Sequence, residues 1–194
     1  MGSTEASNIN TTLALFFIFL SLCSVSSQGK FLGEKQQREP CNNLTLYIHD
    51  ILYNGSNAGN ATSAIVAAPE GGNLTKLAEQ FHFGNIVVFD DPLTKNNDTR
   101  AEQVGRAQGL YLYDTKNTFT AWFGFTIVLN NSEHRGTLQL MGADPLLMQS
   151  RNLSVVGGTG DFFMTRGIAT LMTEDIEWGL SFRLQIDIKL YECW

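Results

Sequence analysis

The sequence has little positive charge and few groups suited to metal binding or nucleophilic catalysis. It has 13 Lys and Arg against 19 Asp and Glu, a net charge of −6, and no basic cluster, so we do not expect it to bind nucleic acid. The three histidines, His49, His82 and His134, lie far apart and form no metal-ligand spacing with cysteine or with one another. No nucleophile-elbow motif occurs, and no motif for copper, haem or flavin. The sequence therefore predicts neither a metal nor a cofactor.

Long hydrophobic runs are also scarce. The run at Leu13–Val25 has thirteen residues, which is too short to span a bilayer, and small residues follow it up to Ser27. This pattern predicts a secretory signal peptide over residues 1–27, with a buried N-terminal helix as the alternative. We expect a flexible segment over residues 28–40 and one domain over residues 41–194. The mature protein is expected outside the cell, with no membrane contact after signal cleavage.

Cysteine is the third scarce component. The sequence has three cysteines, and cleavage of the signal removes Cys23. Cys41 and Cys193 remain and can pair in only one way. Their disulfide would close almost the whole mature chain into one loop and add about 4–5 kcal/mol to the free energy of unfolding in the chain-entropy model. Two unpaired thiols are the alternative, which an oxidising compartment disfavours.

Signals for asparagine-linked glycosylation are abundant, which also favours export. The Asn-x-Ser/Thr motif occurs in the predicted mature chain at Asn43, Asn54, Asn60, Asn73, Asn97, Asn130 and Asn152. We expect several of these asparagines to carry glycans and their surroundings to lie at the surface.

The chain is built from short strands. No stretch has the periodicity of an amphipathic helix, whereas Phe119–Leu129 and Phe182–Leu190 place apolar side chains at every second position, as half-buried strands do. Shorter strand candidates are Leu44–Leu52, Ser63–Ala68, Ile86–Phe89, Ala107–Asp114, Gly136–Met141, Leu153–Val156 and Phe162–Met172.

Turn residues separate these candidates, among them Asn54-Gly55, Gly71-Gly72, Asp91-Pro92 and Asn130-Asn131. About eight strands with short connections predict an all-β fold, an eight-stranded antiparallel β-barrel, because closure removes the exposed strand edges. An open two-sheet sandwich is the alternative.

The glycines at Gly157, Gly158 and Gly160 fit two incompatible structures. A phosphate-binding loop would need a helix directly after the glycines. The residues that follow, Phe162–Thr170, are aromatic and β-branched and favour a strand instead. The glycine run is therefore predicted to be a turn between two strands, near the loop between Asp144 and Arg151.

Two carboxyl groups lie in phase with the apolar faces of their strands. Asp50 falls on the face of Ile48, and Asp144 on the face of Leu140. The interior of an eight-stranded barrel can hold one small ligand, and a carboxyl in apolar surroundings holds its proton more tightly. Both residues are therefore candidate proton donors, although each could merely cap the turn after its strand. For Tyr111 and Tyr113, spacing does not decide which side of the strand points inward.

The chain closely resembles plant dirigent proteins, particularly the branch that forms pinoresinol. The resemblance rests on long segments in the same order: Tyr47–Gly55, Asn60–Gly71, Phe83–Thr94, Val104–Thr118, Gly142–Leu147, Ser154–Thr170 and Ile188–Trp194. It implies a secreted eight-stranded antiparallel barrel, assembled as a homotrimer, with one disulfide between Cys41 and Cys193.

The resemblance also implies a function without a redox centre of the chain's own. In this family a separate laccase or peroxidase oxidises coniferyl alcohol to a radical. The barrel holds two such phenylpropanoid radicals so that they couple 8–8′ with one stereochemistry to pinoresinol, a lignan. The implied setting is the apoplast, in lignan biosynthesis and plant defence.

Six positions match the family's pocket residues: Asp50, Asp144, Tyr111, Tyr113, Arg151 and Phe182. The resemblance implies that Asp144 is the general acid, with Asp50 as a second pocket acid that assists it through hydrogen bonds. The two tyrosines would also donate hydrogen bonds, Arg151 would assist placement, and Phe182 would form an aromatic wall.

The sequence departs from the family at Glu174–Leu180 and at Asn152, where relatives more often have other residues. The loop from Asp144 to Arg151 mixes features of members that form opposite enantiomers, so the handedness of the product is not predicted. Two other functions stay open. One is an isoflavanol dehydratase that forms pterocarpans through a quinone methide, and the other is a non-catalytic binding protein of the cell wall.

Overall fold

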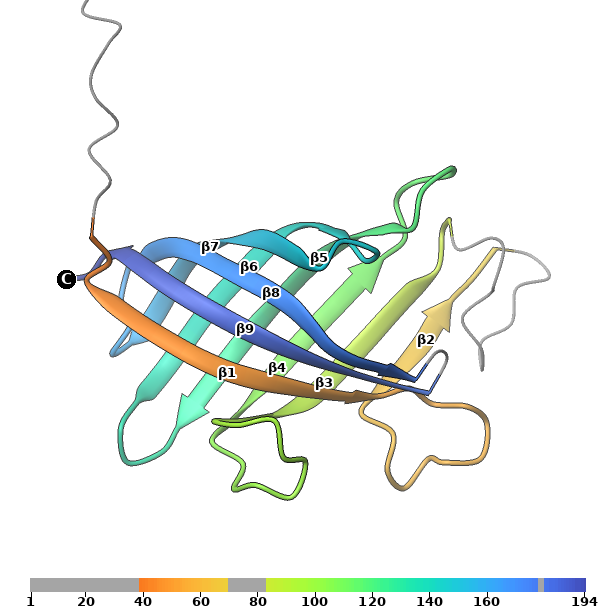
Figure 1. Ribbon diagram of the computed structural model, residues 1–194, viewed down its shortest axis with the longest axis horizontal. Helices are drawn as coiled ribbons and strands as arrows, with labels where there is room; N and C mark the ends of the chain where they lie inside the picture. The colour runs from red at the N-terminus through yellow and green to blue at the C-terminus, as the bar shows by residue number, and fades with distance from the viewer. Residues whose placement is uncertain (1–38, 70–82, 178–179) are drawn as a thin grey trace, which may run out of the picture. The chain divides into compact units, whose positions relative to one another are not determined.

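The computed structural model describes residues 39–69, 83–177 and 180–194. Within these residues the chain is all-β, with strands arranged around one interior (Figure 1). The strands are β1 (Asn42–Ile51), β2 (Ser63–Ala67), β3 (Ile86–Thr94), β4 (Gly105–Leu112), β5 (Thr120–Asn130), β6 (Arg135–Pro145), β7 (Ser150–Gly160), β8 (Arg166–Glu177) and β9 (Ser181–Glu192). The same described part of the chain has no helix that could cross a membrane.

The sheet closes on itself through β1. This strand pairs with β9 along its whole length and with β3 at Tyr47 opposite Thr94 and Ile48 opposite Leu93. Strands β3 to β9 are joined in sequence order by antiparallel pairs. The short strand β2 pairs with the first half of β3, beyond the end of β1. The predicted eight-stranded antiparallel barrel is therefore confirmed and the open sandwich is wrong, while the homotrimer stays a prediction.

The interior is filled by alternate residues of the strands. On β5, Ala121, Phe123, Phe125, Ile127 and Leu129 are all buried, as the alternation predicts. On β9 the apolar residues from Leu184 to Leu190 are buried in the same way. Burial of each such side chain favours folding by roughly 1.5–3 kcal/mol, so period two in the sequence decides which face of each strand turns inward.

A disulfide joins the two ends of the barrel wall. Cys41 and Cys193 are bonded with their Cα atoms 6.3 Å apart, across a sequence separation of 152 residues. The backbone N–H of Cys41 also donates to the carbonyl of Leu190. The predicted pairing is confirmed. Because β1 and β9 are adjacent strands, the bridge fixes the beginning of one beside the end of the other.

The glycine run is part of a strand, so its prediction as a turn is wrong. β7 continues to Gly160, and Gly157–Gly160 pair with Gly136–Gln139 of β6. The turn comes afterwards, and β8 begins only at Arg166, not at Phe162. This turn also lies at the end of β7 far from Arg151, because Arg151 is the second residue of the strand.

Close backbone contacts explain why this strand needs glycine. The chain folds back after β7, and the N–H of Met164 donates to the carbonyl of Gly158. A Cβ atom on Gly158 would lie 2.2 Å from the carbonyl oxygen of Phe162 and 2.8 Å from that of Thr137. Gly160 has φ +62°, a conformation that side chains disfavour. The glycines thus serve close approach and positive φ inside a paired strand.

Asp91-Pro92 is also no turn, since β3 runs through it to Thr94. On one edge of β3, Pro92 is paired with Arg106 of β4. On the other edge, β2 pairs with β3 only up to Phe89, and β1 pairs with it only from Leu93. The missing N–H of proline therefore falls in the gap between two neighbours, where it costs no ladder hydrogen bond.

Most predicted glycosylation sites lie at the surface. Among the described residues, five are exposed and Asn54 is half-buried; the exposed ones are Asn43, Asn60, Asn97, Asn130 and Asn152. Asn73 and the predicted signal peptide lie outside the described residues. Attachment of glycans stays a prediction.

The contacts of the glycine run lead to a paired test. We expect Gly158→Ala to lower the free energy of unfolding by about 2 kcal/mol or more, because its methyl group meets two backbone oxygens that cannot move aside. Gly157→Ala is the matched control, since its Cβ meets only the side chain of Gln139, at 3.6 Å. Its effect should stay within about 1 kcal/mol. Urea unfolding measures both, and equal midpoints for the two variants would contradict this account of the run.

Candidate active site

One end of the barrel contains a pocket with about 580 Å³ of space between its atoms and at its open mouth. It is lined by Ile48, Asp50, Asp91, Tyr111, Tyr113, Phe119, Phe123, Asp144, Leu146, Arg151, Thr173, Ile176, Phe182 and Leu184. The structure therefore brings together all six predicted pocket residues, which come from strands β1, β4, β6, β7 and β9, with Tyr113 just after β4. Mostly apolar walls with a few converging polar groups are typical of sites for small organic ligands.

Asp144 and Arg151 form a buried ion pair in the pocket wall. Arg151 Nε donates to Asp144 Oδ1 at 2.6 Å, and both side chains are almost fully buried. Arg151 Nη1 donates to Thr173 Oγ1 and, at 3.3 Å, to the carbonyl of Met148. Burial raises the pKa of Asp144, and the charge and hydrogen bond of Arg151 oppose this rise. Asp144 lies within β6 and faces inward, so it does more than cap a turn.

Asp50 lies across the pocket on β1, opposite Phe182 of β9. Its side chain is buried, and Ser63 Oγ donates to Asp50 Oδ1 at 2.6 Å. Burial raises the pKa of Asp50 from 3.8 to about 6, and the hydrogen bond from Ser63 opposes the rise. Asp50 can therefore carry a proton under mildly acidic conditions.

A third carboxyl, Asp91 on β3, was missed by the sequence reasoning. It is only 2% exposed, and its Oδ1 has no hydrogen-bond partner among the described residues. Burial and the nearby Asp50 raise its pKa well above the usual range, while a hydrogen bond from Thr62 opposes the rise. The signal was present, because Val87, Phe89, Asp91 and Leu93 alternate inward along β3. It was overlooked because Asp91-Pro92 was interpreted as a turn.

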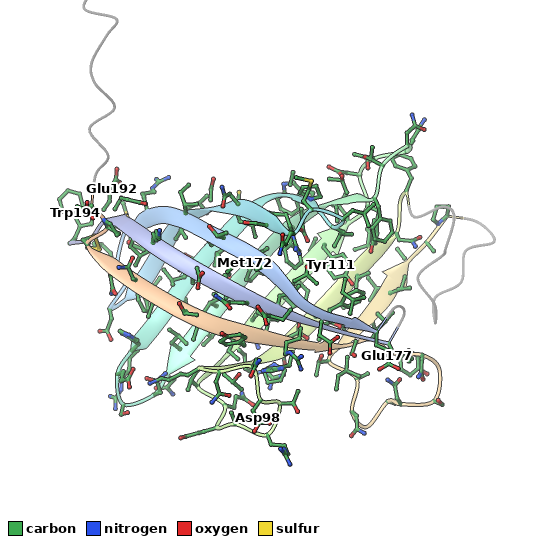
Figure 2. All side chains as sticks on the ribbon, viewed as in Figure 1. Asp98, Tyr111, Met172, Glu177, Glu192 and Trp194 are labelled. Carbon is green, nitrogen blue, oxygen red and sulfur yellow. A yellow bond between two sulfur atoms is a disulfide. The ribbon has the colours of Figure 1, made fainter. Side chains whose placement is uncertain are left out.

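Aromatic side chains form one wall of the pocket. Tyr111 and Tyr113 are both buried, which settles the direction that spacing left open. The Tyr111 ring meets Phe123 edge-on with centroids 5.4 Å apart, and Tyr113 lies 5.4 Å from Phe119. Tyr111 is labelled in Figure 2. Burial raises the pKa of both tyrosines, so their hydroxyl groups stay neutral and can donate hydrogen bonds.

A β-bulge in β8 completes the opposite wall. Thr173 pairs with Leu184 but Asp175 pairs with Arg183, so the register shifts by one residue at Glu174. The shift turns both Thr173 and Ile176 toward the pocket. This stretch belongs to the segment in which the sequence departs from its relatives, and alternation alone could not have placed Ile176 inside.

The site combines buried carboxyl groups on two sides with aromatic and aliphatic walls. Such a pocket can bind planar aromatic molecules, hold them in a fixed orientation, and exchange protons with their oxygen atoms. Among the described residues, no group of three or more His, Cys, Asp and Glu side chains is arranged to hold a metal ion.

Comparisons with known proteins place this barrel in a family. The Dirigent-like protein family matches residues 41–191. The chain is 54% identical to a dirigent protein of Sinopodophyllum hexandrum over the full length of both chains. It is 51% identical to dirigent protein 5 of Arabidopsis thaliana, over 92% of this chain and 94% of the relative.

A solved structure of a pterocarpan synthase dirigent protein superposes with a TM-score of 0.68 and 26% identity, covering 77% of this chain and 83% of that one. The fold and the sequence thus agree on one class, a closed antiparallel barrel with an acidic pocket inside. The chain belongs to the dirigent family.

The raised pKa of Asp50 predicts how stability depends on pH. Its pKa is 3.8 unfolded and about 6 folded, so ionisation above about pH 6 costs on the order of 2–3 kcal/mol of folding free energy. This cost is absent below the unfolded pKa, grows as pH rises between the two pKa values and is complete above the folded one. We expect Asp50→Asn to gain stability relative to the natural chain between about pH 4 and about pH 8, measured by urea unfolding.

Asp90→Asn is the control for this series. Asp90 is exposed, and Arg106 holds its pKa below the usual range, so removing its charge should give no such gain. A constant difference between Asp50→Asn and the natural chain at all pH values would contradict the buried, proton-holding state of Asp50.

Proposed function

We propose that this dirigent protein directs the stereoselective 8–8′ coupling of two coniferyl alcohol radicals to one enantiomer of pinoresinol. The observation that supports this most is the pocket itself, in which carboxyl groups face each other across walls of tyrosine and phenylalanine. The radicals come from a separate laccase or peroxidase, because the proposed role of this chain is to orient the radicals and not to oxidise the alcohol.

Orientation is the first task of the pocket. Two free radicals couple rapidly and with little selectivity, so the product is decided by which faces meet. The aromatic wall around Tyr111 and Phe123 and the opposite wall of Phe182 and Ile176 hold the two aryl rings. Tyr111 and Tyr113 donate hydrogen bonds to oxygen atoms of the substrates, and Arg151 assists their placement beside Asp144.

Ring closure is the second task. Coupling gives a bis-quinone methide, in which each side-chain hydroxyl attacks a methide carbon. As that C–O bond forms, electrons move to the quinone methide oxygen, which takes up a proton, and the hydroxyl loses one. Asp144 is the general acid for this step, with Asp50 as a hydrogen-bonding partner. Burial makes Asp144 hold a proton more tightly than an exposed carboxyl does, and the charge and hydrogen bond of Arg151 favour its release.

The same site could serve a second reaction, the dehydration of an isoflavanol to a pterocarpan through a quinone methide. The similarity to a solved pterocarpan synthase dirigent protein favours this alternative. A non-catalytic binding protein of the cell wall is less favoured, because it gives no role to a buried ion pair and two further carboxyl groups in a pocket.

The setting of the protein completes the proposal. The predicted signal peptide over residues 1–27 and the glycosylation motifs support secretion to the apoplast as a glycoprotein, where phenolic radicals arise. We also propose assembly as a homotrimer and a role in lignan biosynthesis and defence, which the family relationship supports.

The proposal is tested with coniferyl alcohol and a one-electron oxidant, with and without the purified protein. We expect an excess of one enantiomer of pinoresinol on chiral chromatography and less of the other coupling products. Racemic pinoresinol among unchanged coupling products would show that the proposal is wrong. Supplying an isoflavanol without oxidant tests the alternative, for which a pterocarpan is the expected product.

The role of Asp144 has its own test. We expect Asp144→Ala to abolish the selective formation of pinoresinol, and Asp144→Asn to reduce it about 100-fold or more. Circular dichroism should show a folded barrel, although loss of the ion partner of Arg151 lowers stability. The control is Asp114→Asn, because Asp114 is an exposed carboxyl just after β4. An undiminished yield of enantiomerically enriched pinoresinol from folded Asp144→Asn would remove the acid role.

A further inference from the structure

We propose that Asp91 is a further catalytic residue, which shares one proton with Asp50 and donates it to the second quinone methide oxygen. The pocket would then hold two separate proton donors, one for each ring closure. This inference rests on the proposed function, because only that reaction needs two closures in the same pocket.

The unpartnered oxygen of Asp91 is the first observation. Asp91 is 2% exposed and lines the pocket, yet its Oδ1 has no hydrogen-bond partner among the described residues. A buried acceptor without a partner costs about 1–3 kcal/mol, so a fold that retains one at a pocket wall leaves it available to a ligand.

The second observation is that one short segment holds both carboxyl groups. Ser63 Oγ donates to Asp50, and the preceding residue, Thr62, hydrogen-bonds Asp91. Thr62 Oγ1 in turn accepts from the backbone N–H of Ile51 at 2.9 Å, which fixes its position next to β1. Asp50 on β1 and Asp91 on β3 therefore lie close together where these two strands close the barrel.

The third observation is the absence of a compensating cation. Among the described residues, neither Asp50 nor Asp91 forms an ion pair, whereas Asp144 is paired with Arg151. Two carboxylates close together in apolar surroundings cannot both ionise readily, so the pair retains a proton. Burial and the charge of Asp50 both raise the pKa of Asp91.

Other charged and titratable groups around the pair leave this conclusion unchanged. They are Tyr111 and Tyr113 on and after β4, Asp144 on β6, Arg151 on β7, and Asp90 and Arg106 on the outer side of β3 and β4. Arg106 lowers the pKa of Asp91 less than Asp50 raises it, and Arg106 is paired with Asp90 outside the barrel.

The chemistry balances without an oxidant. The proton of the Asp50 and Asp91 pair moves to the quinone methide oxygen and makes it a phenol. The attacking hydroxyl forms the new C–O bond and releases its own proton, which returns the pair to the singly protonated state. Each closure is thus an isomerisation, and the pair ends as it began.

The test compares Asp91→Asn with Asp90→Asn, the exposed neighbour on the opposite face of β3. Coniferyl alcohol and a one-electron oxidant are supplied to the folded proteins, and pinoresinol enantiomers and water adducts of the open 8–8′ dimer are quantified. We expect Asp91→Asn to keep the 8–8′ share of products. The ratio of enriched pinoresinol to water adducts should fall at least about tenfold in this variant. Asp90→Asn should give the same product ratio as the natural chain.

Proton sharing predicts two further results. The double variant Asp50→Asn with Asp91→Asn should lose no more of the ratio of enriched pinoresinol to water adducts than the more severe single variant does. Both substitutions remove the same proton. In protein labelled with ¹³C at the Asp carboxyl groups, NMR should show the Asp50 carboxyl titrating at lower pH in Asp91→Asn than in the natural chain. The decline of ring closure with rising pH should shift in the same direction.

An unchanged product ratio in folded Asp91→Asn would overturn the catalytic role of Asp91. Proton sharing would be overturned by multiplicative losses in the double variant, or by an Asp50 titration that does not shift. If the natural chain itself gives racemic pinoresinol, the proposed function fails instead. The carboxyl titration still decides whether the pair shares a proton in that case.

Discussion

The closure of the barrel between β1 and β3 is the constraint on which the rest of the structure depends. β1 is fully paired with β9 on one edge but reaches β3 at only two positions, and β2 occupies the remaining edge of β3. Between these two neighbours lie Asp90 to Pro92, which is where the strand can accept a proline. The same gap brings Thr62 and Ser63 against Asp91 and Asp50. The seam that closes the fold is therefore also a wall of the site.

Much of this arrangement could be predicted because a strand has a strict period of two. The inward faces of β5 and β9 follow directly from the sequence, and so do the inward positions of Asp50 and Asp144. Asp91 obeys the same period. It was missed because Asp-Pro favours turns in isolation, and only the position of a strand among its neighbours shows that a missing N–H is harmless there.

Other features depend on contacts that sequence patterns do not contain. Gly158 lies in a paired strand and is needed because the following turn folds back onto it, so the reason for the glycine lies in the position of Phe162. Ile176 reaches the pocket because of a bulge at Glu174, which reverses the alternation for the end of β8. Tyr111 alternates with residues as apolar as itself, and only packing against Phe123 decides its direction.

The pocket has two acidic centres, Asp144 beside Arg151 and the pair of Asp50 and Asp91. Neither can determine the handedness of the product in the proposed reaction. Asp144 is paired with a fixed cation, whereas Asp50 and Asp91 form no ion pair among the described residues. Either centre can supply a proton only after the bond between the two radicals has formed. Ring closure is intramolecular, so its stereochemistry follows from that earlier bond. Handedness must then be determined by the walls that hold the aryl rings during coupling. Phe182 and Ile176 are paired across β9 and β8 on one such wall, and Ile176 lies in the segment where this sequence departs from its relatives.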